Sequence, residues 1–205
     1  MTTFNNPHNT WNQRFDTAQY IFGEAPNAYL QRQARHLQMG AALAVADGEG
    51  RNGVWLAEQG LSVDAFDFSE NAIQKARNLA QRKATSVNWH CCDWKSFQWQ
   101  PAHYDNMVGI FFQFATPTER SALFAKMDAS LKPSGTLIIQ GYTTAQLQFN
   151  TGGPGKAEHM YDEQMLREAF SNYDIIDLQT YEAHIHEGTA HKGMSGLLGL
   201  TARKR

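Results

Sequence analysis

The most constraining feature of this chain is a glycine-rich stretch, AVADGEGRNG, at residues 44–53. Its three glycines have the spacing G-x-G-x-x-G: Gly48, Gly50 and Gly53. The apolar run 41–46 before it predicts a buried strand, and 51–60 after it predicts a helix. A strand, a tight glycine loop and a helix in this order hold nucleotide-containing ligands in parallel sheets. The spacing alone does not choose between a dinucleotide and another ligand of similar length.

Beyond this unit, short apolar runs alternate with helical patterns. Further strands are predicted at 61–68, 86–93, 104–114 and 135–142. Helices are predicted at 69–83, with Ser69 as N-cap, and at 116–133, where Thr116 precedes Pro117 at the first helical position. This alternation predicts an α/β fold, a Rossmann-like doubly wound sheet that is mostly parallel and has helices on both faces.

The two ends of the chain have a different texture. Residues 1–40 are rich in aromatic residues, Asn and Gln, and we expect them to form a lid over the open end of the sheet. A helix at 161–170 is followed by strands at 173–185 and 194–204, which a short turn joins into an antiparallel hairpin. We therefore expect a single domain with three parts: 1–40 as N-terminal lid, 41–145 as cofactor-binding half and 146–205 as substrate-side half.

Composition excludes several classes of protein. The 205 residues are 42% hydrophobic and 19% charged, with a net charge of −2, so a broad nucleic-acid surface is not expected. No apolar stretch is long enough to span a membrane, and the first residues lack the features of a signal peptide. Cys91 and Cys92 are adjacent, which suggests neither a disulfide framework nor a metal site. We expect a cytoplasmic monomer or weak homodimer that acts on a small molecule.

Charged residues near the glycine loop separate the ligand classes. Asp67 ends the second predicted strand, where an acid accepts hydrogen bonds from ribose hydroxyls. Asp47 and Glu49 lie beside the glycines, where they would repel a pyrophosphate unless Arg51 compensated. A cationic ligand without phosphate, such as S-adenosylmethionine, would be tolerated.

Residues at the ends of the third and fourth predicted strands are further candidates for binding this ligand. Asp93 follows the third predicted strand and could accept a hydrogen bond from an adenine amine, with Trp94 or Cys92 against the ring. Ile110 and Phe111 form an apolar end of the fourth strand, which suits a flat base or a thioether chain. Little chain remains for the second substrate-holding portion that a nicotinamide enzyme usually needs, although such an oxidoreductase stays an alternative.

At this point the chain resembles a known family. AVADGEGRNGVWLAEQG, VDAFDFSENAIQKA, CCDW, YDNMVGIFF and LKPSGTLIIQGY are similar, in this order, to class I S-adenosylmethionine-dependent methyltransferases. GEGRNGVWLAEQG followed by DFS resembles the branch of tellurite-resistance and thiopurine methyltransferases. WNQRF, YIFGEAPNAYL and LQFNTGGP look like segments of small bacterial proteins of that branch.

The resemblance implies a seven-stranded sheet with its last strand antiparallel. It also implies that Gly48 and Gly50 approach the methionine part of the cofactor, that Asp67 holds the ribose, that Asp93 contacts the adenine, and that the main chain at 110–111 lies near the methionine end. The other residues assigned to cofactor binding are Asp47, Asn52, Phe68, Trp11 and Tyr20.

One departure from the family pattern concerns the first strand. Most members carry an acid there, but this chain has Ala44 and Ala46. The cofactor's ammonium group would then be held by Asp47 or by the N-terminal segment. A non-catalytic module that senses S-adenosylmethionine therefore remains an alternative.

Catalytic candidates follow from the chemistry of methyl transfer. A thiolate or chalcogen oxyanion acceptor needs no general base, whereas a hydroxyl or protonated amine needs one. Tyr142, after the fifth strand, and His191, in the turn of the last hairpin, are the leading candidates, followed by Glu187 and Gln113. We expect a small-molecule methyltransferase with a thiol or other soft chalcogen acceptor, which releases S-adenosylhomocysteine. O- or N-methylation of a small metabolite is the alternative.

Overall fold

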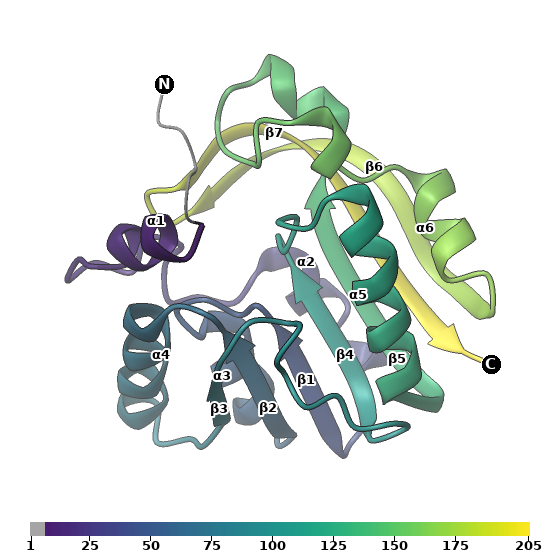
Figure 1. The fold of residues 1–205 in the computed structure, drawn as a ribbon, viewed down its shortest axis with the longest axis horizontal. Coiled ribbons are helices and arrows are strands. Elements are labelled where there is room, and N and C mark those ends of the chain that lie inside the picture. Colours follow the sequence, from purple (N-terminus) through teal and green to yellow (C-terminus); the bar gives the residue numbers. More distant parts are fainter. Residues whose placement is uncertain (1–6) are drawn as a thin grey trace.

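Within residues 7–205, which the computed structural model describes, seven strands form one sheet (Figure 1). The strands are β1 (Ala41–Val45), β2 (Ser62–Asp67), β3 (Asn88–Cys91), β4 (Tyr104–Ile110), β5 (Leu131–Tyr142), β6 (Tyr173–Glu187) and β7 (His191–Lys204). Their order is β3-β2-β1-β4-β5-β7-β6. Strand β7 pairs antiparallel with both neighbours, and the other pairs are parallel. The predicted seven-stranded, doubly wound sheet with its last strand antiparallel is confirmed.

Helices begin where the sequence places their caps. They are α1 (Pro7–Arg14), α2 (Ala28–Arg32), α3 (Arg51–Glu58), α4 (Glu70–Arg82), α5 (Pro117–Ser130) and α6 (Glu163–Ala169), with 3-10 turns at Ala34–His36, Thr144–Gln148 and Ala157–His159. The Ser69 side chain accepts from the Ala72 N–H, and Thr116 forms a capping box with Glu119. Both predicted caps are confirmed, because each oxygen satisfies an N–H that has no partner within the helix.

Several strand boundaries differ from the sequence prediction. Strand β3 spans only Asn88–Cys91, and β4 ends at Ile110 rather than at residue 114. Strand β5 begins at Leu131 rather than at residue 135, because helix α5 ends at Ser130 rather than at residue 133, and Ser134 within the strand has a φ of 63°. Strand β7 begins at His191 rather than at residue 194, and Glu187 pairs with His191 across the hairpin. His191 is therefore a strand residue at the hairpin end and not a solvated turn residue, because backbone pairing continues up to the turn.

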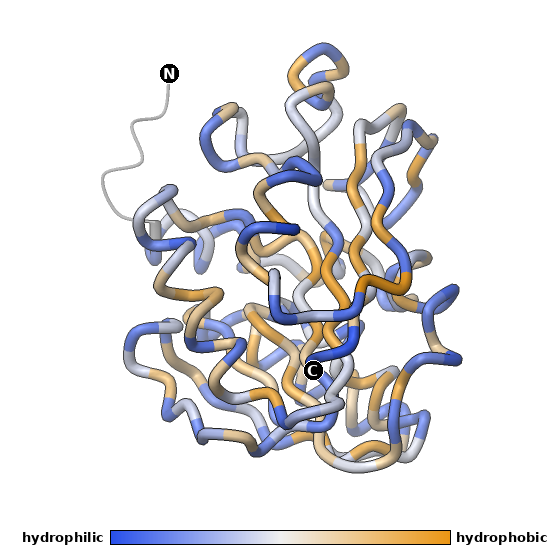
Figure 2. Tube along the Cα trace, turned by 90° about the vertical axis from the view of Figure 1, so that its right-hand side faces the viewer, coloured by the Kyte–Doolittle hydropathy of each residue, from blue (hydrophilic) through white to orange (hydrophobic). Residues whose placement is uncertain are grey.

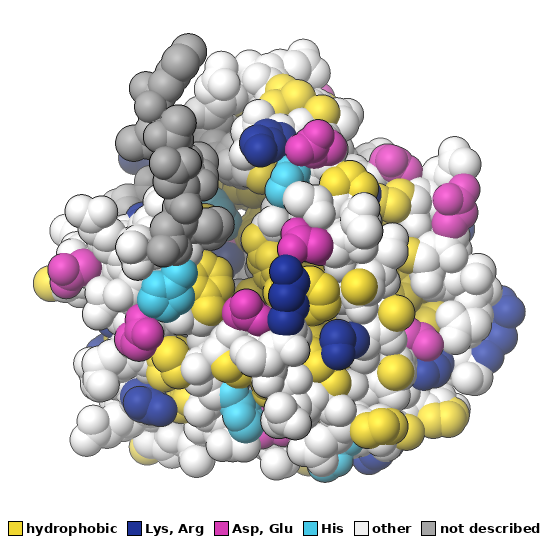
Figure 3. Space-filling view, viewed as in Figure 1, with side chains coloured by type: hydrophobic (Ala, Val, Ile, Leu, Met, Phe, Trp, Pro, Cys, Tyr) yellow, Lys and Arg dark blue, Asp and Glu magenta, His cyan; other side chains and the backbone are white. Residues whose placement is uncertain are grey.

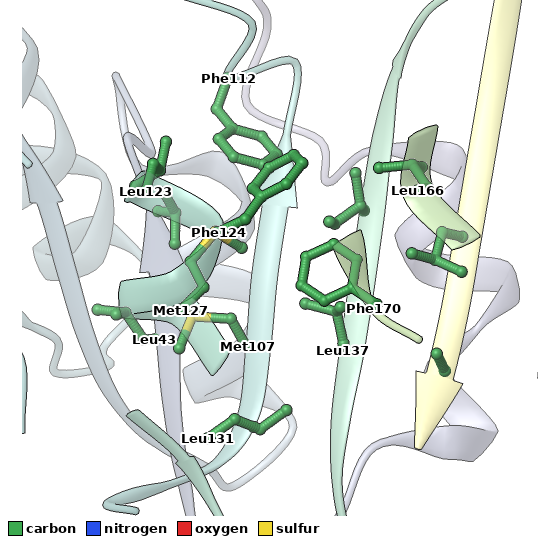
Figure 4. Packing of buried hydrophobic residues seen from close by; sticks show 14 of the residues in the cluster. Leu43, Met107, Phe112, Leu123, Phe124, Met127, Leu131, Leu137, Leu166 and Phe170 are labelled. Atoms are coloured by element: carbon green, nitrogen blue, oxygen red, sulfur yellow. The ribbon is translucent and has the colours of Figure 1, made fainter. Parts of the chain in front are cut away.

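Alternating strand residues bury two apolar layers on opposite faces of the sheet. One cluster packs side chains of α5 and α6 against strand residues that include Leu43, Met107 and Leu137 (Figure 4). The other packs α2 and α3 against residues that include Ala44 and Val108. In Figure 2 the hydrophobic colour accordingly follows the central strands. Helices on both faces leave only the strand ends open for a ligand.

The N-terminal segment crosses the carboxyl ends of the strands. The Asn12 side chain accepts from the Asn71 N–H at the start of α4, and Phe15 lies closest to Gly48. The segment then reaches the face of the sheet through α2 and returns to the amino end of β4, where Asn106 accepts from the Gln38 N–H. This path lays the segment over the glycine loop.

The β6–β7 hairpin arches over the same edge of the sheet from the other side (Figure 1). Its tip meets the N-terminal segment, because the Ile21 carbonyl accepts from the N–H groups of Thr189 and Ala190. Gly188 packs so closely there that a Cβ would lie 2.3 Å from the Ile21 carbonyl oxygen. Among the described residues, no helix is long and apolar enough to cross a membrane.

Candidate functional site

The glycine loop joins β1 to α3 through left-handed backbone. Gly48 has a φ of 59° and Gly50, the N-cap of α3, a φ of 89°. A Cβ on Gly50 would lie 2.6 Å from the Ala76 Cβ and 2.8 Å from the Trp89 ring. Glycine is therefore required at Gly50 for both conformation and space. The loop places backbone beside the end of β2 with no side chain between.

Asp67 lies where the sequence predicts a ribose ligand. One carboxylate oxygen accepts from the Gly48 N–H at 3.0 Å and the other from the Ser69 N–H at 2.9 Å. Burial raises the pKa of Asp67 to about 6 despite these hydrogen bonds. Each oxygen keeps a second lone pair, so this anchored carboxylate fits an adenosine ribose.

Asp47 occupies the loop between β1 and the first glycine. Its carboxylate accepts from the Gly53 N–H at 2.8 Å, and burial raises its pKa to about 7. An adjacent cation would favour the ionised form. Asp47 could therefore hold an ammonium group. It would replace the acid that most family members carry in the first strand, where this chain has Ala44 and Ala46.

Glu49 has a different role from the one expected. Its buried carboxylate accepts from the N–H groups of Ile21 and Phe22 and forms an ion pair with Lys75 at 2.5 Å. This charge is neutralised and fixes the N-terminal segment, so it does not repel a ligand. Of the two carboxylates beside the glycines, only that of Asp47 is therefore left to repel a pyrophosphate.

The other residues predicted to bind cofactor lie in several environments. Asn52 is buried, and its side-chain oxygen accepts from the Asn27 N–H. Phe68 follows Asp67, and the Cys92 N–H donates to the Asp67 carbonyl, so β2 and β3 end side by side. Asp93 is exposed and caps the next turn through the Lys95 N–H.

Trp94 is buried in the core beneath β3 and packs away from solvent. Ile110 is buried in the opposite core layer, while Phe111 turns out of β4 with a φ of 54°. Trp11 stacks on Phe15 near the glycine loop. Tyr20 lies away from Asp67, because its hydroxyl donates to the Lys75 carbonyl on α4.

Both catalytic candidates lie in one aromatic cluster at the ends of β4 and β5. The Phe111 ring stacks on Tyr142 at 4.6 Å between centroids and meets the His191 edge at 4.5 Å. Phe22 of the N-terminal segment covers His191 at 4.5 Å. The structure thus brings Tyr142 and His191 together, with their ring centroids 5.8 Å apart. Figure 3 shows this face hollowed between α1 and the strand ends.

Glu187 ties this cluster to the glycine loop. Its carboxylate forms an ion pair with Arg51 at 2.7 Å and accepts from the Asn27 amide at 3.0 Å. Although burial alone would raise it, the neighbouring His191 and Arg51 lower the pKa of Glu187 to about 2. Burial lowers the pKa of His191, whose Nδ1 lies 3.9 Å from Glu187. The arrangement holds a neutral imidazole beside a carboxylate, as in a general base.

The side-chain amide of Gln113 is already hydrogen-bonded to backbone groups of the fold. Its side-chain oxygen accepts from the Tyr142 N–H at 2.6 Å, and its nitrogen donates to the Tyr142 and His159 carbonyls. It therefore mimics a strand partner for Tyr142 and has no amide donor left for an acceptor.

Two polar residues of this edge escaped the sequence analysis. Asn27 connects Asn52, Gln140 and Glu187. Arg14 is exposed, with its guanidinium carbon 4.7 Å from the Trp11 ring centroid, and partial desolvation lowers the pKa of Arg14 although Glu49 and Tyr142 raise it. The available signals were the motifs WNQRF, which contains Arg14, and YIFGEAPNAYL, which contains Asn27, and they do not give the direction of these side chains.

Part of the chain is similar in sequence to a known family. Residues 42–135 match a family described as methyltransferase domain. No curated protein sequence matches the chain. The domain match covers the glycine loop, Asp67 and the ends of β3 and β4, and it favours a methyltransferase over the nicotinamide alternative.

Solved structures share the fold over nearly the whole chain. A protein whose structure concerns the conversion of a disulfide bond into a thioacetal group during echinomycin biosynthesis is 16% identical with a TM-score of 0.76, covering 97% of this chain and 92% of that one. TehB from Haemophilus influenzae is 16% identical with a TM-score of 0.72, covering 97% and 67%. The 1,6-didemethyltoxoflavin-N1-methyltransferase of Burkholderia thailandensis, solved with S-adenosylhomocysteine, is 23% identical with a TM-score of 0.63, covering 86% and 76%.

At these identities the likeness shows the fold. The chain therefore has the fold of these solved structures, and its residues 42–135 are similar to a methyltransferase domain.

Proposed function

We propose that this protein methylates a small molecule held between the N-terminal segment and the ends of β4 and β5. The observation that carries the proposal is the pairing of Tyr142 with His191 in one buried cluster, joined through Glu187 and Arg51 to the glycine loop. When bound, the cofactor supplies a methyl group that its positive sulfur already activates, and S-adenosylhomocysteine remains.

The chain's own residues position the two reactants. Gly48 offers backbone to the methionine part, Asp67 accepts from the ribose and Asp47 faces the ammonium group. Phe22, Phe111 and Tyr142 wall the acceptor side and exclude water, which supports an in-line approach. The N-terminal segment acts as the lid, because Glu49 and the hairpin tip hold it over this site.

We infer a thiol or other soft chalcogen acceptor as the leading class. The support is the resemblance of GEGRNG and WNQRF to the tellurite-resistance branch, together with the TM-score of 0.72 to TehB. O- or N-methylation is the second candidate, since the neutral His191 beside Glu187 could take the proton of a hydroxyl or amine.

An acceptor screen tests the proposal. Purified protein with S-adenosylmethionine is offered thiols, selenite, phenols and amines, and S-adenosylhomocysteine release is measured. We expect turnover with at least one acceptor, and a loss in His191→Gln only if that acceptor must lose a proton. Cofactor binding without turnover across the panel would favour the sensing module.

A further inference from the structure

Asn27 lies where four elements around the aromatic cluster meet. It is 1% exposed and directly precedes α2 in the N-terminal segment. Its backbone N–H donates to the Asn52 side chain of α3 at 3.0 Å. Its side-chain amide donates to Gln140 of β5 at 2.6 Å and to Glu187 of β6 at 3.0 Å. Asn27 therefore joins the N-terminal segment to the helix of the glycine loop, to the centre of the sheet and to the hairpin.

The orientation of the Asn27 amide follows from the groups that its two ends face. Its oxygen accepts from the Leu30 N–H at 3.0 Å and so caps α2. A backbone N–H can only donate, so the amide nitrogen must face the side-chain oxygens of Gln140 and Glu187. Among the residues that cap helices well, Ser, Thr and Asp have no amide hydrogens to donate, whereas asparagine has two. Asparagine therefore does at this position what the other caps could not.

The two carboxylate oxygens of Glu187 have different partners. Oε1 accepts from the Asn27 amide and from the Ala28 N–H at 3.3 Å. Oε2 accepts from Arg51 at 2.7 Å and lies 3.9 Å from His191 Nδ1. His191 Nδ1 is buried and has no hydrogen-bond partner in the described part of the chain. The N-terminal segment thus holds the carboxylate about 1 Å beyond hydrogen-bond range of the imidazole.

The other groups that face His191 do not carry a second negative charge. Burial is the largest cause that lowers the pKa of His191, and the charges of Arg51 and Arg14 lower it further. The Tyr142 hydroxyl stays protonated, because burial raises the pKa of Tyr142. The aromatic rings that reach His191 from β4 and from the N-terminal segment are uncharged. The position of the Glu187 carboxylate therefore decides how strongly the imidazole is drawn to its charged form.

We propose that Asn27 is a positioning residue of the proposed methyl-acceptor site, whose amide holds the Glu187 carboxylate at a distance from His191. This inference rests on the proposed function, and it applies to acceptors that must lose a proton. Without the amide, the carboxylate can turn toward His191 Nδ1, where an ion pair favours the charged imidazole. The N-terminal segment thus keeps His191 neutral and able to accept a proton.

Titration of His191 by NMR tests the inference in the protein without an acceptor. The signal of the His191 ring is assigned by its loss in His191→Gln. Asn27→Ser keeps an oxygen that can cap α2 but removes the amide. We expect this variant to raise the pKa of His191 toward its ordinary value of 6.5, because Glu187 can then pair with the imidazole. An unchanged His191 titration in Asn27→Ser would overturn the inference.

A double-mutant cycle separates this role from a structural one. A loosened N-terminal segment would also raise the pKa of His191, because water would reach the ring whether or not residue 187 is charged. If Asn27 acts through the carboxylate, Asn27→Ser should leave the His191 titration unchanged in a Glu187→Gln background. An equal shift in both backgrounds would mean that Asn27 only fastens the segment, which is incompatible with the inference.

Asn106→Ser is the matched control for the segment. Asn106 is buried in β4, and its side chain bonds the backbone N–H and carbonyl of Gln38 at 2.9 and 2.8 Å. Both asparagine variants should lower Tm, because each leaves buried hydrogen-bonding groups without a partner. Asn106→Ser should leave the His191 titration unchanged. A shift as large as that of Asn27→Ser would assign the effect to the segment and refute the inference.

Turnover gives a second readout once the acceptor screen has found a substrate that must lose a proton. The acid limb of its pH–rate profile reports the pKa of the base, so Asn27→Ser should move this limb to higher pH. An acid limb that stays in place would contradict the inference. Absence of turnover with every acceptor would count against the proposed function instead, and the His191 titration would still decide the role of Asn27.

Discussion

Individual carboxylates at the strand ends have protonation states that a bound cation would change. Asp47 and Asp67 have pKa values raised by burial to about 7 and about 6. Protonation of these two carboxylates therefore stabilises the folded protein when no cofactor is bound. This contribution to the free energy of unfolding is fully present below the ordinary Asp pKa of 3.8 and is lost as pH rises to about 7. The site becomes anionic near neutral pH.

The first prediction follows from this linkage. S-adenosylmethionine is cationic, so its affinity should increase as pH rises from 5 to 8, by at most about tenfold per pH unit for each linked proton. Calorimetry in buffers of different ionisation enthalpy should show proton release on binding. Asp47→Asn should make the affinity for S-adenosylmethionine depend less on pH. A wild-type affinity that does not change with pH would contradict this prediction.

At the scale of elements, the glycine loop and the β6–β7 hairpin each depend on one residue that tolerates few substitutions. Gly50 lets α3 begin beside α4, and Glu187 ties the β6–β7 hairpin to α3 and to the N-terminal segment. The sequence predicted both elements. It could not predict that they meet, because Arg51 and Glu187 are 136 residues apart.

Gly50→Ala should destabilise the protein by well over the roughly 1 kcal/mol that a left-handed alanine costs, because its Cβ would meet Ala76 at 2.6 Å. Gly155→Ala is the matched control, since Gly155 has a φ of 69° and no atom within 4 Å of the added Cβ. Urea unfolding should show a small loss for Gly155→Ala and a larger one for Gly50→Ala. Equal losses would mean that conformation alone requires the glycine.

Glu187→Gln should lower the free energy of unfolding by about 3 kcal/mol, since it leaves the buried Arg51 without its counter-charge. Glu182→Gln on the same strand is exposed and should change stability by less than about 0.5 kcal/mol. Thermal unfolding of the two variants makes the comparison. Similar Tm values would show that Arg51 finds another partner.

At the scale of the whole molecule, local sequence patterns predicted more of the fold than of the candidate site. Caps such as Ser69 and Thr116 are local, so the helices begin where they were predicted. The direction of Tyr20 and the ion pair of Glu49 depend on contacts with α4, which no local pattern contains. Tyr142 and His191 were predicted separately as catalytic candidates, and the arching hairpin alone brings them together.

At the same scale, the N-terminal segment borders the proposed site. Asn12, Phe22 and Asn27 contact α4, β7 and Glu187 in turn, so the segment follows the whole carboxyl edge of the sheet. The segment also contacts His191 through the Phe22 ring and Glu49 through the N–H groups of Ile21 and Phe22. The proposed site therefore includes the first and last parts of the chain as well as the matched residues 42–135.

The most direct test of this account is calorimetric titration of wild type and Asp67→Ala with S-adenosylhomocysteine, with NAD as the control ligand. We predict micromolar binding to wild type, no binding of NAD, and a loss of about 1–3 kcal/mol in Asp67→Ala, the scale of ribose hydroxyls left without a partner. Equal affinity in both proteins would remove Asp67 from the site. Absence of S-adenosylhomocysteine binding to wild type would contradict the account itself.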